Sequence, residues 1–112
     1  MIRVKWALEE SVVLFDFYFK HNEATHPSKE ELERLSEIYN KRADKLEILH
    51  DEKFRNVAGL SMQLACILYV VTDGQAGFSS ASRVHYDAYR LFQNDKAKFE
   101  AIVKEFYEKY TV

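Results

Sequence analysis

Apolar residues recur at helical spacing along most of the chain and predict an all-α protein. The pattern indicates a compact bundle of about five helices that forms a single domain over residues 1–112. The expected helices cover residues 8–20, 29–46 and 57–71, then a segment from just after Ser79 or Ser80 to Phe92, and a last one from a cap at Asn94 or Asp95 to the C-terminus.

The third expected helix is apolar around most of its circumference, so we expect it to lie at the centre of the packing. Asn56 is well placed to cap it, and Ser28 with Glu31 has capping-box spacing at the start of the second. The first three helices are expected to form a helix-turn-helix-like core. The inward stripe of the third helix is predicted to be Leu60, Leu64, Ile67, Leu68 and Val71.

Composition narrows the class of protein. Three glycines and one proline leave few turn residues, which favours a few long helices. The formal net charge of −2 excludes a globally basic nucleic-acid binder. No signal peptide and no apolar run long enough to cross a bilayer is evident, so a cytoplasmic protein without membrane contact is expected.

Catalytic, metal and cofactor chemistry is not expected. The single cysteine, Cys66, lies in an apolar run and predicts a buried, inert thiol. His21 and His26 do not share a helix face, so they do not predict a metal site. Cys66 and His85 do not predict a nucleophile–base pair, because no third group that would orient the histidine is evident. No phosphate-binding loop or hydrolase motif occurs.

Three segments resemble the helical domain found at the N-terminus of many bacterial HNH endonucleases. They are "KWALEESVVLFDFYFK", "FRNVAGLSMQL", which is similar to the motif Arg-Asn-x-x-Gly-x-x-Met-(Lys/Gln)-Leu, and "GFSSASRV". The chain departs from the pattern at Ala7 and Cys66, and it has Gln63 where the family often has lysine. Its four histidines do not make the cluster of an HNH metal site. The resemblance implies the accessory module without the nuclease, a module presumed to help recognise DNA.

Five residues are candidates for contact with double-stranded DNA. Arginine can bond guanine and asparagine or glutamine can bond adenine, and these residue types gather near the start of the third helix. The following serine-rich turn could bind phosphate. Alternatively, Asn56 is only a cap, Arg55 pairs with Asp51 or Glu52, and the turn is plain. The candidates are Arg55, Asn56, Gln63, Ser82 and Arg83.

The segment from Lys53 to Gln93 carries an excess of two positive charges and the remainder an excess of four negative ones, which suits one nucleic-acid face.

A rival hypothesis comes from aromatic residues near the C-terminus. If exposed, they would mark a protein-interaction surface or a homodimer interface. The alternative function is then a protein-interaction module, such as a phage- or mobile-element-encoded inhibitor or adaptor acting on a defence protein. Alternatively they close the bundle. These residues are Tyr86, Tyr89, Tyr107 and Tyr110.

Overall fold

The computed structural model describes residues 4–21, 27–77 and 81–111, and the regular structure in these ranges is helical. The prediction of a compact all-α protein with five helices is confirmed. The helices are α1 (Leu8–Lys20), α2 (Lys29–Lys45), α3 (Val57–Val71), α4 (Arg83–Asn94) and α5 (Lys96–Tyr110).

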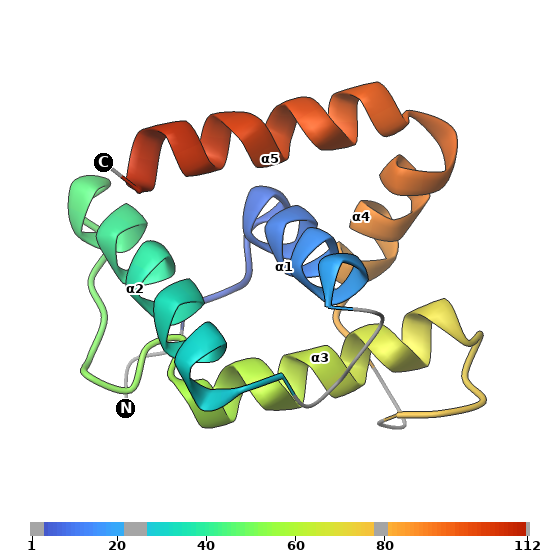
Figure 1. Ribbon diagram of the computed structural model, residues 1–112, viewed down its shortest axis with the longest axis horizontal. Helices are drawn as coiled ribbons and strands as arrows, with labels where there is room; N and C mark the ends of the chain where they lie inside the picture. Colours follow the sequence, from blue (N-terminus) through green and yellow to red (C-terminus); the bar gives the residue numbers. More distant parts are fainter. Residues whose placement is uncertain (1–3, 22–26, 78–80, 112) are drawn as a thin grey trace.

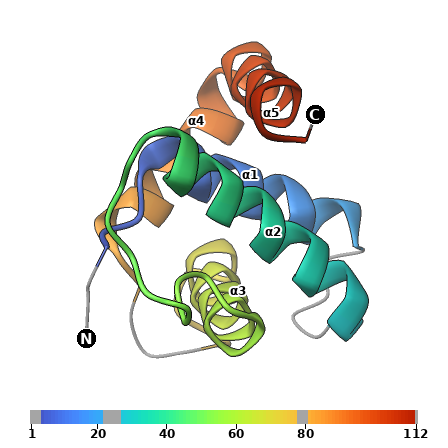
Figure 2. The same ribbon diagram turned by 90° about the vertical axis from the view of Figure 1, so that its left-hand side faces the viewer.

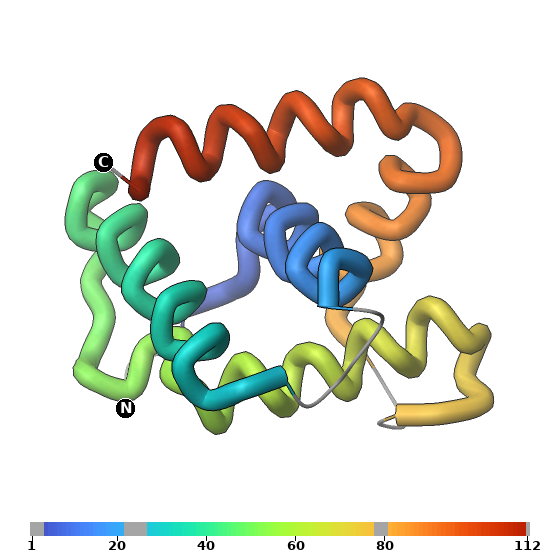
Figure 3. The backbone as a smooth tube through the Cα atoms, viewed as in Figure 1, coloured from blue at the N-terminus to red at the C-terminus, as the bar shows by residue number. Residues whose placement is uncertain are grey.

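Short polar side chains set the start of three helices. Asn56 Oδ1 accepts a hydrogen bond from the Gly59 amide at 2.8 Å, which confirms the predicted cap of α3. Ser28 Oγ likewise accepts from the Glu31 amide at 3.2 Å at the start of α2. Asp95 alone joins α4 to α5 and caps the latter, which makes the sharp corner in Figure 3.

The fourth helix begins at Arg83 with Ser82 as its N-cap, later in the chain than predicted. The predicted caps Ser79 and Ser80 lie outside the described residues. The helix ends at Asn94, two residues past the predicted Phe92, because no breaker precedes Asp95.

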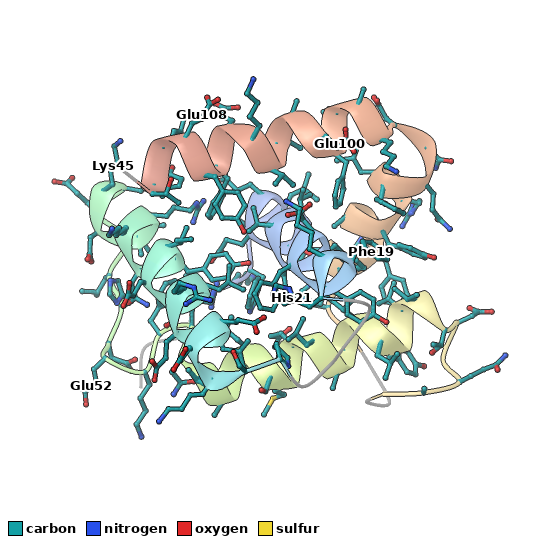
Figure 4. All side chains as sticks on the ribbon, viewed as in Figure 1. Phe19, His21, Lys45, Glu52, Glu100 and Glu108 are labelled. Atoms are coloured by element: carbon teal, nitrogen blue, oxygen red, sulfur yellow. The ribbon has the colours of Figure 1, made fainter. Side chains whose placement is uncertain are left out.

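The centre of the bundle is α1, not α3 as predicted. Figure 1 and Figure 2 show α1 enclosed by the other helices, with α5 on one side and α3 on the opposite side. Four consecutive residues of α1, Val12 to Phe15, are fully buried, which requires neighbours all round the helix. Charged side chains such as Glu52 and Glu108 point away from this centre in Figure 4.

One face of α3 is on the surface although its residues are apolar. Leu60, Leu64 and Ile67 are fully buried, whereas Met62 is 52% exposed. The segment after the helix folds back and covers part of it: Gly77 lies directly against the α3 backbone near Ala65. The apolar residues of α3 led to the prediction of a central helix. In the structure they face the core, this returning segment and the surface.

Within the first three helices, α3 lies against both α1 and α2. The connection between α2 and α3, however, spans residues 46–56. It is longer than the three- or four-residue turn of a DNA-binding helix-turn-helix, so the likeness to that motif is limited to packing. Among the described residues, no helix has both the length and the apolar character needed to cross a membrane.

Candidate nucleic-acid interface

The side chain of Arg55, a predicted DNA contact, is turned into the protein. Its Nε donates to Glu10 Oε2 at 2.9 Å and its Nη2 to Glu10 Oε1 at 3.0 Å. The same guanidinium lies between the rings of Trp6 and Phe54, at 4.3 and 4.4 Å from their centroids. With 7% of the side chain exposed, Arg55 is not available to read a base.

Arg55 also fixes the segment that precedes α1. Its Nη1 donates to the Val4 carbonyl at 3.3 Å and its Nη2 to the Lys5 carbonyl at 3.2 Å. The backbone at Arg55 has a φ of 49°, in the left-handed region. The alternative that Arg55 is structural is supported, but its partner is Glu10 rather than Asp51 or Glu52.

Glu10 is the buried acceptor on which this cluster depends. Its side chain is 1% exposed, and Oε1 also accepts from the Ala7 amide at 3.0 Å, which caps α1 in place of a hydroxyl. A second pair, Glu9 with Arg42, joins α1 to α2, and Arg42 Nη1 approaches Glu10 at 3.8 Å. Two arginines beside one buried carboxylate offset the cost of its desolvation.

Gln63 belongs to a buried chain of polar side chains. Ser11 Oγ and His85 Nδ1 are 2.6 Å apart, and His85 Nε2 and Gln63 Oε1 are 2.7 Å apart. Burial, with a smaller contribution from Arg55, lowers the pKa of His85 to about 4, so its ring is neutral at pH 7. A neutral ring has one donor and one acceptor, so Nε2–H donates to Gln63 and Nδ1 accepts from the Ser11 hydroxyl.

A surface groove of about 490 Å³ lies beside this chain, between the segment preceding α1, the middle of α3 and the start of α4. Two predicted contacts, Gln63 and Ser82, meet in it although they are far apart in sequence. Its lining contains no carboxylate among the described residues. We call it the α3–α4 groove; its lining is Lys5, Trp6, Gln63, Cys66, Ala81, Ser82 and Val84.

The remaining predicted contacts divide between this groove and the interior. Ser82 and Arg83 are exposed at the start of α4, and no side-chain cap bond holds the Ser82 hydroxyl. Asn56 is occupied as the cap of α3. The structure therefore brings Gln63, Ser82 and Arg83 to one region and places Arg55 and Asn56 in internal roles.

The four predicted interaction tyrosines do not form one exposed surface. Tyr110 is buried and packs edge-on against Phe106, while Tyr89 stacks on Phe15 of α1. Burial, and then Asp16, raises the pKa of Tyr107 to about 12. Tyr86 is 38% exposed. The prediction of a shared surface is wrong for Tyr110, because these rings mostly close the bundle around α1.

His21 and Cys66 make contacts within the fold. His21 contacts the Phe17 carbonyl and Glu31, and His26 lies outside the described residues. Among the described residues, no group of three or more potential ligands could hold a metal ion. Cys66 is 9% exposed, and burial raises the pKa of its thiol.

Sequence reasoning missed Lys5 and Ser11. Lys5 lies in a short segment outside the helices, so no helical pattern connects it with the start of α4. Ser11 occupies a buried position of α1, and its hydrogen-bond partner His85 is 74 positions away in the sequence. Comparison of the chain with protein-family models, with curated proteins and with solved structures found no match.

Proposed function

We propose that the chain is a small noncatalytic DNA-interaction module that contacts duplex DNA through the α3–α4 groove. The observation that carries the proposal is the meeting of Lys5, Gln63 and Ser82 in one groove whose described lining has no carboxylate. Exposed Arg83 adds a second cation beside it. The resemblance to the N-terminal domain of HNH endonucleases supports the same class.

The side chains would divide the work by chemistry. Lys5 and Arg83 are suited to phosphate oxygens, and the Ser82 hydroxyl can donate to another. The Gln63 amide is suited to a base edge. Arg55 would act indirectly, since it holds the backbone on which Lys5 stands.

A titration of labelled duplex at several salt concentrations tests the proposal. Lys5→Ala and Arg83→Ala should each weaken binding to all sequences and lower the salt slope by about one unit, because each removes one phosphate contact. Arg34→Ala is the matched control: it removes an exposed charge from α2, away from the groove lining. Absence of parent binding even at low salt would overturn the proposal.

A second candidate function, a protein-interaction module, is favoured by another pocket. Tyr86 and Tyr89 line a depression of about 350 Å³ together with Asp73 and Arg90. An aromatic depression with both charge signs suits a protein surface. Sedimentation without DNA tests the homodimer form of this candidate: Tyr86→Ser should shift a dimer to monomer, and a parent that is monomeric at all concentrations contradicts it.

A further inference from the structure

We propose that the α3–α4 groove accepts one unpaired nucleotide, with its base beside Trp6 and Gln63 and its phosphate near Lys5 and Arg83. This inference rests on the proposed DNA-binding function and names the part of the nucleic acid that the groove recognises. A base inside a duplex is stacked and paired on both sides, so it reaches a side-chain pocket only when it is extruded or already unpaired.

The Gln63 amide has a fixed orientation at the groove. His85 Nε2 lies 2.7 Å from Gln63 Oε1, and the ring is itself held by Ser11 Oγ at 2.6 Å. The amide nitrogen therefore points away from the imidazole, and its two N–H donors have no hydrogen bond to a described residue. Donors held in place at a groove suit the ring-nitrogen and carbonyl acceptors of a base.

Much of the groove wall is apolar. Trp6 is held by edge-on contacts with Tyr39 and His85, with ring centroids 5.4 and 5.7 Å away. Cys66, Ala81 and Val84 line the same groove. Its volume of about 490 Å³ lies within the range of small-molecule sites, and a rigid aromatic beside apolar walls suits a planar base.

The charged groups at the groove are basic. Lys5 belongs to the groove lining, and Arg83 is exposed between the lining residues Ser82 and Val84. Four other surface pockets each include a carboxylate, whereas the described lining of this groove has none. An anionic ligand is therefore favoured here over a cationic one. The contrasting carboxylates are Glu105, Glu31, Asp73 and Asp87.

Trp6 is the sole tryptophan of the chain, so its fluorescence reports on the groove directly. The experiment titrates the full chain with a duplex carrying a single unpaired thymidine, with the fully paired duplex of the same sequence, and with thymidine monophosphate. The unpaired site should bind roughly tenfold more tightly than the paired duplex, as one stacked base implies, and should quench Trp6.

Two variants test the groove independently of each other. Gln63→Glu keeps an oxygen for His85 but replaces the donors, and Ser82→Phe fills the groove from an exposed position. Both should abolish the preference for the unpaired site. Gln93→Glu makes the same charge change at an exposed position of α4 and should leave that preference unchanged. Circular dichroism confirms that each variant is folded.

The outcomes separate this inference from the proposed function. Equal binding of paired and unpaired duplexes, or an unpaired-site preference that survives in both folded variants, overturns the nucleotide site while duplex binding stands. Quenching of Trp6 by thymidine monophosphate that both variants abolish, without binding of any duplex, supports the nucleotide site and overturns the DNA module. No response to any probe overturns both.

Discussion

Arg55 and Glu10 are 45 positions apart in the sequence, yet they form a two-bond ion pair that joins the start of α3 to the first turn of α1. The rings of Trp6 and Phe54 pack against the guanidinium of this pair. Trp6, Glu10 and Arg55 thus meet at one point. Their shared environment gives these residues a structural role.

Replacing Arg55 by alanine should lower the free energy of unfolding by about 3–5 kcal/mol, because it leaves the carboxylate of Glu10 buried without its main partner. Urea unfolding measures the change. Arg83→Ala removes an exposed arginine and should shift stability by less than about 0.5 kcal/mol. Equal effects of the two substitutions would contradict the buried pair.

The two faces of α3 should respond differently to truncation. Leu64→Ala empties a fully buried position and should destabilise the protein by about 2–5 kcal/mol. Met62→Ala, two residues earlier and 52% exposed, should cost less than about 1 kcal/mol. Thermal unfolding of both variants checks the orientation of the helix, and a larger effect at Met62 would mean that the helix faces the other way.

Most helix ranges, with α4 as the exception, could be predicted from the sequence because caps and periodicity are local signals. The bounds of α1 and α3 agree with the prediction, and Asn56 caps α3 as expected. The identity of the central helix could not be predicted, because apolar residues on α3 also serve the surface and the returning segment at Gly77. Burial of α1 depends on which helices surround it, which is a property of tertiary packing.

The candidate site was predictable only in part, for the same reason. Gln63, Ser82 and Arg83 come to one region as the motifs suggested, but residue type alone did not distinguish them from Arg55. An arginine at a helix start can face a phosphate or a buried carboxylate. Its actual partner, Glu10, lies in the first turn of another helix, where an acid is also expected for its effect on the helix dipole.

Gly77 should tolerate no side chain. Its φ is +86°, and a Cβ there would lie 2.8 Å from the Tyr69 amide nitrogen and closer still to the Ala65 carbonyl. Gly74 has a similar φ of +83° but meets only the Tyr69 ring at 3.4 Å, so Gly74→Ala isolates the cost of the backbone conformation. Gly77→Ala should destabilise more than Gly74→Ala in urea unfolding. Equal losses would show that the segment does not pack against α3.

Stability should fall in mild acid because of His85. Its pKa is lowered from 6.5 to about 4 by burial, so between these pH values the unfolded chain binds a proton that the folded chain does not. The free energy of unfolding therefore rises with pH across this window, by on the order of 3 kcal/mol, and His85 adds no further pH dependence above it.

Urea unfolding at several pH values measures this dependence, and His85→Gln should make it shallower between pH 6.5 and 4. His50→Gln is the control. Hydrogen bonding to Asp44 raises the pKa of His50, so that residue stabilises the fold at low pH and the contribution is lost as pH rises through its folded pKa. A slope that His85→Gln leaves unchanged would assign the acid sensitivity to carboxylates instead.

Cys66 should react slowly with thiol reagents in the folded protein. It is 9% exposed, and burial raises the pKa of its thiol, so both access and the thiolate fraction are low. Cys66→Ser combined with Met62→Cys places a thiol on the exposed face of the same helix and should label at least roughly tenfold faster.

Urea concentrations below the unfolding transition extend this test. If labelling of Cys66 requires the α3–α4 groove to open, the logarithm of its labelling rate should rise linearly with urea concentration. The slope should reflect the surface that opens, while the labelling rate at position 62 stays nearly constant. Rapid labelling of Cys66 without urea would contradict its burial. Such a thiol would be accessible from the groove, and a redox or nucleophilic role for Cys66 would then have to be tested.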